Sequence, residues 1–147
     1  NGAYMSHRMA MDHPDTIAAI AGLAGMPSFK LDGPEPVRPV NILQIHGTND
    51  RVIQFEGGKI GNNAYPSARE TIDLWAKYNG VPGRARISPK KLDLDKSIEG
   101  DETTVTQYRD GRTELWAIQD GTHIPTISDT FSRQVIEWLM AHPKSKR

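Results

Sequence analysis

The pattern of apolar and polar positions along the chain predicts helices that alternate with buried strands. The N-terminal segment repeats at helical spacing, with Met5 and Met9 on one face, until Pro14 ends the pattern. Two continuous apolar runs follow, "TIAAIAGLAG" at 16–25 and "VNILQIHG" at 40–47, and a proline-rich connector separates them. Short continuous runs are typical of parallel strands covered on both faces. We therefore expect one helix followed by two buried parallel strands.

The second half of the chain predicts two further helices on either side of a hairpin. Ser67 and Glu70 have the spacing of a capping box, and the helix that they begin ends at Asn79. The segments "TTVTQYR" and "TELWAIQ" are rich in β-forming residues and flank the turn signal "DGR", which predicts a hairpin. Residues 129–142 predict an amphipathic helix. The charged segment 89–102 has no clear period and predicts a surface loop.

This order of elements predicts an α/β fold, with a mostly parallel sheet and helices on both of its faces. The chain has 147 residues and no internal repeat, so we expect one domain that spans 1–147. Eighteen basic residues balance eighteen acidic ones, so charge gives no reason to expect nucleic acid or an anionic membrane as a partner. The absence of cysteine excludes disulfides and thiolate nucleophiles, and the histidine spacing matches no metal motif such as H-E-x-x-H.

Three candidate site residues lie at the predicted carboxyl ends of strands, in the order Asn1, Asp50 and His123. Open α/β sheets place their active sites at these ends. A serine becomes a nucleophile when an imidazole takes its proton and a carboxylate orients that imidazole. A strand-to-helix turn of the type G-x-S-x-G would put this serine directly before Asn1, whose backbone N–H would then face the oxyanion. No serine in the chain itself has glycines at both −2 and +2, so the chain alone is expected to be inactive.

Each of these residues also has a simpler interpretation. Asp50 lies in "GTND", which is good turn chemistry, and Asn1 precedes glycine, which is a common turn pair. His123 could be an ordinary loop histidine. His46 ends a predicted strand, and we expect it to be a structural residue near the site rather than a second base. "EGG" at 56–58 is expected to be a loop near the mouth of the site. Core packing is expected of the three tryptophans, Trp75, Trp116 and Trp138.

Four segments carry a resemblance to a known family: "NGAYMSHRMAMDHPDTIAAIAGLAG", "ILQIHGTNDRVIQFEGG", "PSARETIDLWAKYNG" and "ELWAIQDGTHIP". They resemble the polyhydroxybutyrate depolymerase-like esterases, which are relatives of feruloyl and acetyl xylan esterases in carbohydrate esterase family one. The resemblance implies the C-terminal part of an α/β-hydrolase domain, without the N-terminal strands and the nucleophile serine. It assigns the acid to Asp50, the base to His123 and an oxyanion-hole N–H to Asn1. The chain departs from the family pattern at Ala3, Ile53 and Ile124.

The family resemblance implies a serine-type carboxylic ester hydrolase that needs no metal or cofactor and acts on a polyester, a feruloylated polysaccharide or a small ester. It also implies a secreted or periplasmic protein. Two alternatives remain open: a non-catalytic α/β-hydrolase relative that serves as a binding module, and a serine peptidase of the prolyl oligopeptidase type. Without neighbouring strands, the apolar run from Ile17 to Ala24 would leave a free sheet edge, so we expect the isolated chain to associate.

Overall fold

The computed structural model describes residues 1–27, 39–81, 83–108 and 111–144. Its elements follow in the order α1 (Gly2–Asp12), β1 (Ala19–Leu23), β2 (Asn41–Gly47), β3 (Gly58–Ile60), β4 (Asn63–Tyr65), α2 (Ala68–Tyr78), β5 (Arg86–Leu92), β6 (Thr103–Gln107), β7 (Thr113–Ile118) and α3 (Phe131–Ala141). The predicted proline-rich connector lies largely outside the described residues, as does Asp110 of the "DGR" turn. The predicted order of helices and strands is therefore confirmed, with β3, β4 and β5 in addition.

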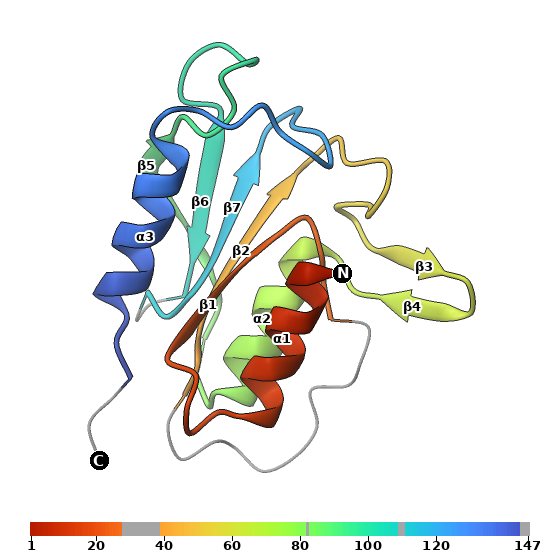
Figure 1. Ribbon diagram of the computed structural model, residues 1–147, viewed down its shortest axis with the longest axis vertical. Helices are drawn as coiled ribbons and strands as arrows, with labels where there is room; N and C mark the ends of the chain where they lie inside the picture. Colours follow the sequence, from red (N-terminus) through yellow and green to blue (C-terminus); the bar gives the residue numbers. More distant parts are fainter. Residues whose placement is uncertain (28–38, 82, 109–110, 145–147) are drawn as a thin grey trace.

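Five strands form one mixed sheet in the order β1-β2-β7-β6-β5 (Figure 1). The pairs β1–β2 and β2–β7 are parallel, as predicted, whereas β7–β6 and β6–β5 are antiparallel. The expectation of a mostly parallel sheet is therefore wrong for half of the strand pairs. The physical reason is connection length, because the short link between β6 and β7 can only return the chain antiparallel.

Strand β5 corrects the prediction of a surface loop over 89–102. Residues up to Leu92 pair with β6, and only the remainder forms a loop. This strand lies at the edge of the sheet, so most of its side chains are exposed and carry no alternation of apolar and polar positions. Pro89 and a break in register between Ile87 and Lys91 further hide its β character in the sequence.

Helices cover both faces of the sheet, as predicted. On one face, α1 and α2 pack over β1, β2 and β7, where Ala10 and Trp75 meet Ile42. On the other face lies α3, whose Phe131 and Trp138 belong to a core cluster with side chains of β2, β5, β6 and β7 (Figure 1). The predicted core positions of the tryptophans are confirmed, since all of them are buried: Trp75, Trp116 and Trp138.

Helix α2 begins with the predicted capping box. The Glu70 N–H donates to Ser67 Oγ at 3.0 Å, and the Ser67 N–H donates to the Glu70 carboxylate at 2.8 Å. Helix α1 presents a less expected pattern. Met5 and Met9 are 54% and 42% exposed, and the face toward the sheet carries His7 and Ala10. The apolar methionine face of α1 is thus left uncovered in the described structure.

Candidate active site

Asp50 lies in the turn that follows β2, and its two carboxylate oxygens have separate partners. Oδ1 accepts the backbone N–H groups of Val52 and Ile53, at 2.8 and 2.9 Å. This arrangement stabilises the turn, as the simpler interpretation of "GTND" predicts. It also fixes the carboxylate plane, so Oδ2 points in a defined direction. Asp50 is thus a turn-former through one oxygen and available to the site through the other.

His123 lies in the loop after β7 and meets Asp50. Its Nδ1 is 2.9 Å from Asp50 Oδ2, although the two residues are 73 positions apart. The Asp50 side chain is fully buried, whereas that of His123 is 32% exposed. The geometry therefore has a buried carboxylate behind a partly exposed imidazole, which is the arrangement of an acid–base pair at the edge of a site.

The two loops are held together by their backbones. A Cβ on Gly47 would collide with the Gly121 carbonyl, so the close approach of the loops requires glycine at this position. Asn49 N–H donates to the Gly121 carbonyl at 2.9 Å, and Asp120 N–H donates to Thr48 Oγ1 at 2.9 Å. Because β2 and β7 are parallel neighbours, their carboxyl ends meet at one edge of the sheet, and the glycine contact draws the loops into register.

The charge state of Asp50 follows from competing effects on its pKa. Burial alone would raise the pKa, but the hydrogen bonds from His123 and from the N–H groups of Val52 and Ile53 outweigh it and hold the pKa below its ordinary value. The carboxylate is therefore ionised at neutral pH and accepts the proton on His123 Nδ1. This leaves Nε2 of His123 as the nitrogen able to take up a proton.

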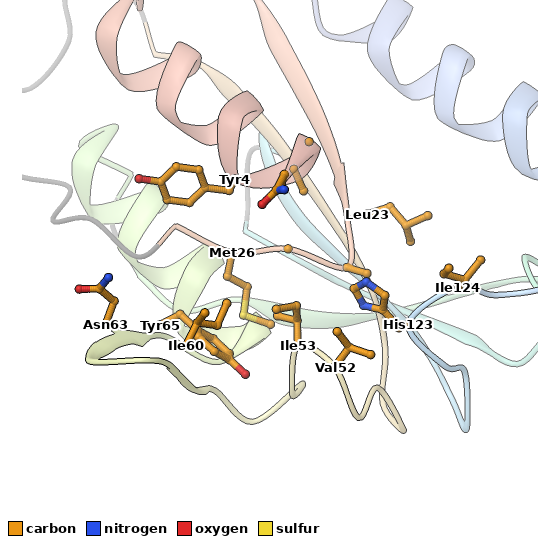
Figure 2. A pocket seen from close by; sticks show the side chains of 15 residues that line it. Tyr4, Leu23, Met26, Val52, Ile53, Ile60, Asn63, Tyr65, His123 and Ile124 are labelled. Carbon is orange, nitrogen blue, oxygen red and sulfur yellow. The ribbon is translucent and has the colours of Figure 1, made fainter.

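A pocket of about 740 Å³ opens beside His123 (Figure 2). Five segments line it: the first turn of α1, the end of β1 with the residues after it, the loop after β2, the β3–β4 hairpin and the loop after β7. None of the described residues that line it is Asp, Glu, Lys or Arg. The polar side chains that line it are those of Asn1, Tyr4, Asn63, Tyr65 and His123. The pocket therefore suits an uncharged ligand.

Asn1 lines the same pocket at the N-terminus of α1. Its carbonyl accepts the Met5 N–H at 3.0 Å, so the first helical turn is closed, and its side chain makes no capping hydrogen bond. The structure thus brings Asn1 and His123 to one pocket, with Asp50 behind His123 and outside the lining. The N-terminal end of a helix carries partial positive charge, which favours a developing negative charge at this position.

The β3–β4 hairpin was missed by the sequence prediction. The loop expected at 56–58 runs into β3, and Ile60 and Tyr65 of the hairpin line the pocket (Figure 2). A usable signal was present, because Gly61 and Asn62 form a two-residue turn of a composition typical of hairpins. The expected loop at 56–58 does not itself line the pocket; the hairpin that follows it does.

His46 lies next to Asp50, as expected of a structural residue near the site. It is fully buried, with Nε2 2.8 Å from the Ile53 carbonyl and 3.1 Å from Asp50 Oδ2. Burial lowers its pKa from the ordinary value, and the Ile53 carbonyl and Asp50 only partly counteract this. His46 is therefore neutral at pH 7, donates its Nε2–H to the Ile53 carbonyl and lies beside the carboxylate without being its counter-charge.

Within the described ranges, no group of three or more His, Asp or Glu side chains is placed to hold a metal ion. The same part of the chain contains no helix that is both long and apolar enough to cross a membrane. The contact between Asp50 and His123 offers acid–base chemistry beside the pocket.

The comparisons with known proteins add one similarity. No family model matches the chain. Over 96 residues it is 28% identical to a protein of Nocardia uniformis subsp. tsuyamanensis named "Putative esterase NocK". The alignment covers 58% of this chain and 28% of that protein, so the chain spans little more than a quarter of the length of the curated relative that it matches.

Proposed function

We propose that this chain forms the acid–base part of the active site of a serine-type carboxylic ester hydrolase with an α/β-hydrolase fold. The observation that carries the proposal is the 2.9 Å contact between Asp50 Oδ2 and His123 Nδ1 at the edge of an uncharged pocket. The similarity to a protein named as an esterase supports the hydrolase class. The family resemblance of the motifs supports the narrower group of polyhydroxybutyrate depolymerase-like and feruloyl esterases.

In the proposed mechanism, the nucleophile is a serine directly before Asn1 in a longer protein. His123 Nε2 takes the serine proton as Oγ bonds to the ester carbonyl carbon, and Asp50 stays ionised to stabilise the imidazolium. The Asn1 backbone N–H donates to the oxyanion. Imidazolium then returns the proton to the leaving alcohol as the C–O bond breaks, which leaves an acyl-enzyme. Water releases the acid by the same steps, with His123 again as the base.

The substrate class follows from the lining of the pocket. Because no lining side chain is an Asp, Glu, Lys or Arg, a charged acyl or alcohol group would lose hydration without gaining a charged side chain as partner. We therefore assign the pocket to neutral esters. The apolar side chains around it would contact the acyl chain, among them Leu23, Met26, Val52, Ile53 and Ile60.

The proposal is tested in the protein that includes the residues before Asn1. The codon before Asn1 should encode serine, and the protein should hydrolyse p-nitrophenyl butyrate. His123→Ala should lower kcat/KM by roughly a thousandfold or more. Near-normal turnover in this variant would exclude the proposed role of His123, and a residue other than serine before Asn1 would favour a non-catalytic binding module.

A further inference from the structure

A network of hydrogen bonds between buried side chains runs from both helices on one face of the sheet to His46, which lies against Asp50. Trp75 Nε1 lies 2.9 Å from His7 Nδ1, and His7 Nε2 lies 3.1 Å from Gln44 Oε1. Gln44 Nε2 lies 3.3 Å from His46 Nδ1, and His46 Nε2 lies 3.1 Å from Asp50 Oδ2. The first four side chains are fully buried. We call this set, Trp75, His7, Gln44, His46 and Asp50, the buried hydrogen-bond network.

The direction of every hydrogen bond in the network follows from its first member. An indole N–H can only donate, so His7 Nδ1 accepts and His7 Nε2 carries the proton. That proton goes to the carbonyl oxygen of Gln44, whose amide nitrogen must then donate. It donates to the Gly25 carbonyl at 3.1 Å and to His46 Nδ1. His46 Nδ1 is therefore an acceptor, and its Nε2–H donates to the Ile53 carbonyl at 2.8 Å, with Asp50 Oδ2 at 3.1 Å from the same nitrogen.

Burial keeps both histidines of the network neutral. It lowers the pKa of His7 to about 4 and also lowers that of His46. A neutral imidazole has one donor and one acceptor nitrogen, which is what each link needs. The titratable groups that face His46 among the described residues are Asp50 and His123, and His7 lies one link further along the network. The ring of Phe55 contacts His46 edge-on at 5.8 Å and contributes no charge.

Asp50 therefore receives donors at both of its oxygens. Val52 and Ile53 N–H groups donate to Oδ1, and the His123 imidazole N–H donates to Oδ2. His46 Nε2–H donates to the Ile53 carbonyl at 2.8 Å, and the same nitrogen lies 3.1 Å from Oδ2. Buried polar groups in the middle of a strand cost free energy unless they are paired, and an apolar pair at positions 44 and 46 would pack there without that cost. The network pairs these groups and places one oriented N–H between the Ile53 carbonyl and the carboxylate oxygen that His123 uses.

We propose that His46 is a positioning residue, which holds Asp50 Oδ2 toward His123 and limits the basicity of that oxygen through a tautomer set by Trp75, His7 and Gln44. The inference deepens the proposed function and rests on it for any effect on catalysis. Without the His46 donor, Oδ2 would attract the His123 imidazolium more strongly. The pKa of His123 would then rise, and the acid limb of the activity profile would move to higher pH.

The first test reads the tautomers in the unsubstituted chain by nitrogen-15 NMR of the imidazole rings at pH 7. The network requires the Nε2–H tautomer at both His7 and His46. A His46 ring protonated at Nδ1, or protonated at both nitrogens, would overturn the proposal without any variant having to fold.

The second test follows the titration of His123 by NMR in variants of His46. His46→Phe keeps the ring but removes the donor, and it should raise the pKa of His123 by roughly half a unit or more. His46→Gln places an amide N–H near the position of Nε2, and it should return the pKa toward its original value. If both variants titrate as the unsubstituted chain does, or both shift equally, the role is structural only and the proposal fails.

The start of the network is tested by Trp75→Phe, with Trp116→Phe as the matched control. Trp75→Phe removes the N–H that sets the tautomer of His7, whereas Trp116→Phe removes an equally buried N–H that donates to Glu114 outside the network, at 3.0 Å. Only Trp75→Phe should change the tautomer populations of His7. The NMR readouts need no catalytic activity, so their failure is distinguishable from a failure of His123→Ala to reduce ester hydrolysis.

Discussion

His123 and Asp50 share a hydrogen bond of 2.9 Å across 73 residues of sequence, and the backbones of their two loops hold it in place. The same carboxylate uses its other oxygen to close the turn after β2. A substitution that separates these two functions of Asp50 therefore distinguishes a turn-former from a catalytic acid.

Asp50→Asn makes this separation. An asparagine Oδ1 can still accept the Val52 and Ile53 N–H groups, so the turn should form, and the melting temperature should fall only by the part that the ionised carboxylate contributes. The amide nitrogen cannot accept the His123 N–H, so the imidazole loses its correct tautomer. In the serine-bearing protein, kcat/KM for p-nitrophenyl butyrate should fall by roughly a thousandfold or more. A large loss of thermal stability with activity retained would show that Asp50 serves only the turn.

Acidification should destabilise the fold through His7. Burial lowers the pKa of His7 to about 4 from the ordinary histidine value of 6.5. Between these values the unfolded state binds a proton that the folded state does not, so stability is greatest above pH 6.5 and falls as the pH drops toward 4. The loss should be about 3 kcal/mol, as measured by urea unfolding across this window. His7→Gln should reduce the pH dependence of the free energy of unfolding, whereas His13→Gln at an exposed position should not.

Acidification below about pH 4 should remove a further contribution to folding stability, which comes from Asp50. Its pKa is depressed in the folded state, so its stabilisation is present above the ordinary carboxyl pKa and is lost as the pH falls through the lower folded value. Asp50→Asn should therefore be less sensitive than the unsubstituted chain below about pH 4, in unfolding experiments that use the same urea series. An identical acid dependence in the two proteins would contradict the assigned charge state.

The uncharged pocket predicts selectivity for neutral esters. An ester whose acyl group ends in a carboxylate should be hydrolysed at least about tenfold less efficiently than its neutral analogue. Ile60 is 60% exposed at the pocket, so Ile60→Arg should raise kcat/KM for the acidic ester relative to the neutral one. Ile136→Arg is the matched control, since this residue is 58% exposed and lies on α3 away from the pocket. Equal effects of both arginines would exclude a local role of the pocket.

The free side of β1 predicts association of the isolated chain. In the described structure β1 pairs only with β2, its sequence "AIAGL" carries no charge, and the exposed Met5 and Met9 lie on the helix that packs against it. Light scattering after gel filtration should detect oligomers at micromolar concentration. Ala21→Lys on this edge should reduce them, whereas Ala141→Lys at the exposed end of α3 should not. A monodisperse monomer would contradict the prediction.

Local signals in the sequence were sufficient to predict most elements and the pairing of Asp50 with His123. The capping box of Ser67 and Glu70 involves neighbours in sequence, and a continuous apolar run such as 40–47 carries its own signal of burial on both faces. The order of the acid and the base at strand ends depends only on connectivity. These features need no knowledge of packing.

Features that depend on tertiary neighbours were not predicted. Strand β5 is exposed along most of its length, so its β structure comes from pairing with β6 rather than from its own pattern. His7 and Gln44 look like isolated polar residues in apolar segments, and their roles become visible only where α1 lies over β2. The buried face of α1 was not predicted either, because its methionines form a more apolar helical face than the one that carries His7.

The central claim is that Asp50 and His123 activate a serine directly before Asn1, and covalent labelling tests it most directly. The serine-bearing protein is treated with a fluorophosphonate, and the modified residue is identified by mass spectrometry. We predict a single modified serine immediately before Asn1, with labelling slowed by orders of magnitude in His123→Ala. Absence of the label from that position, or equal labelling rates in the two proteins, would contradict the claim.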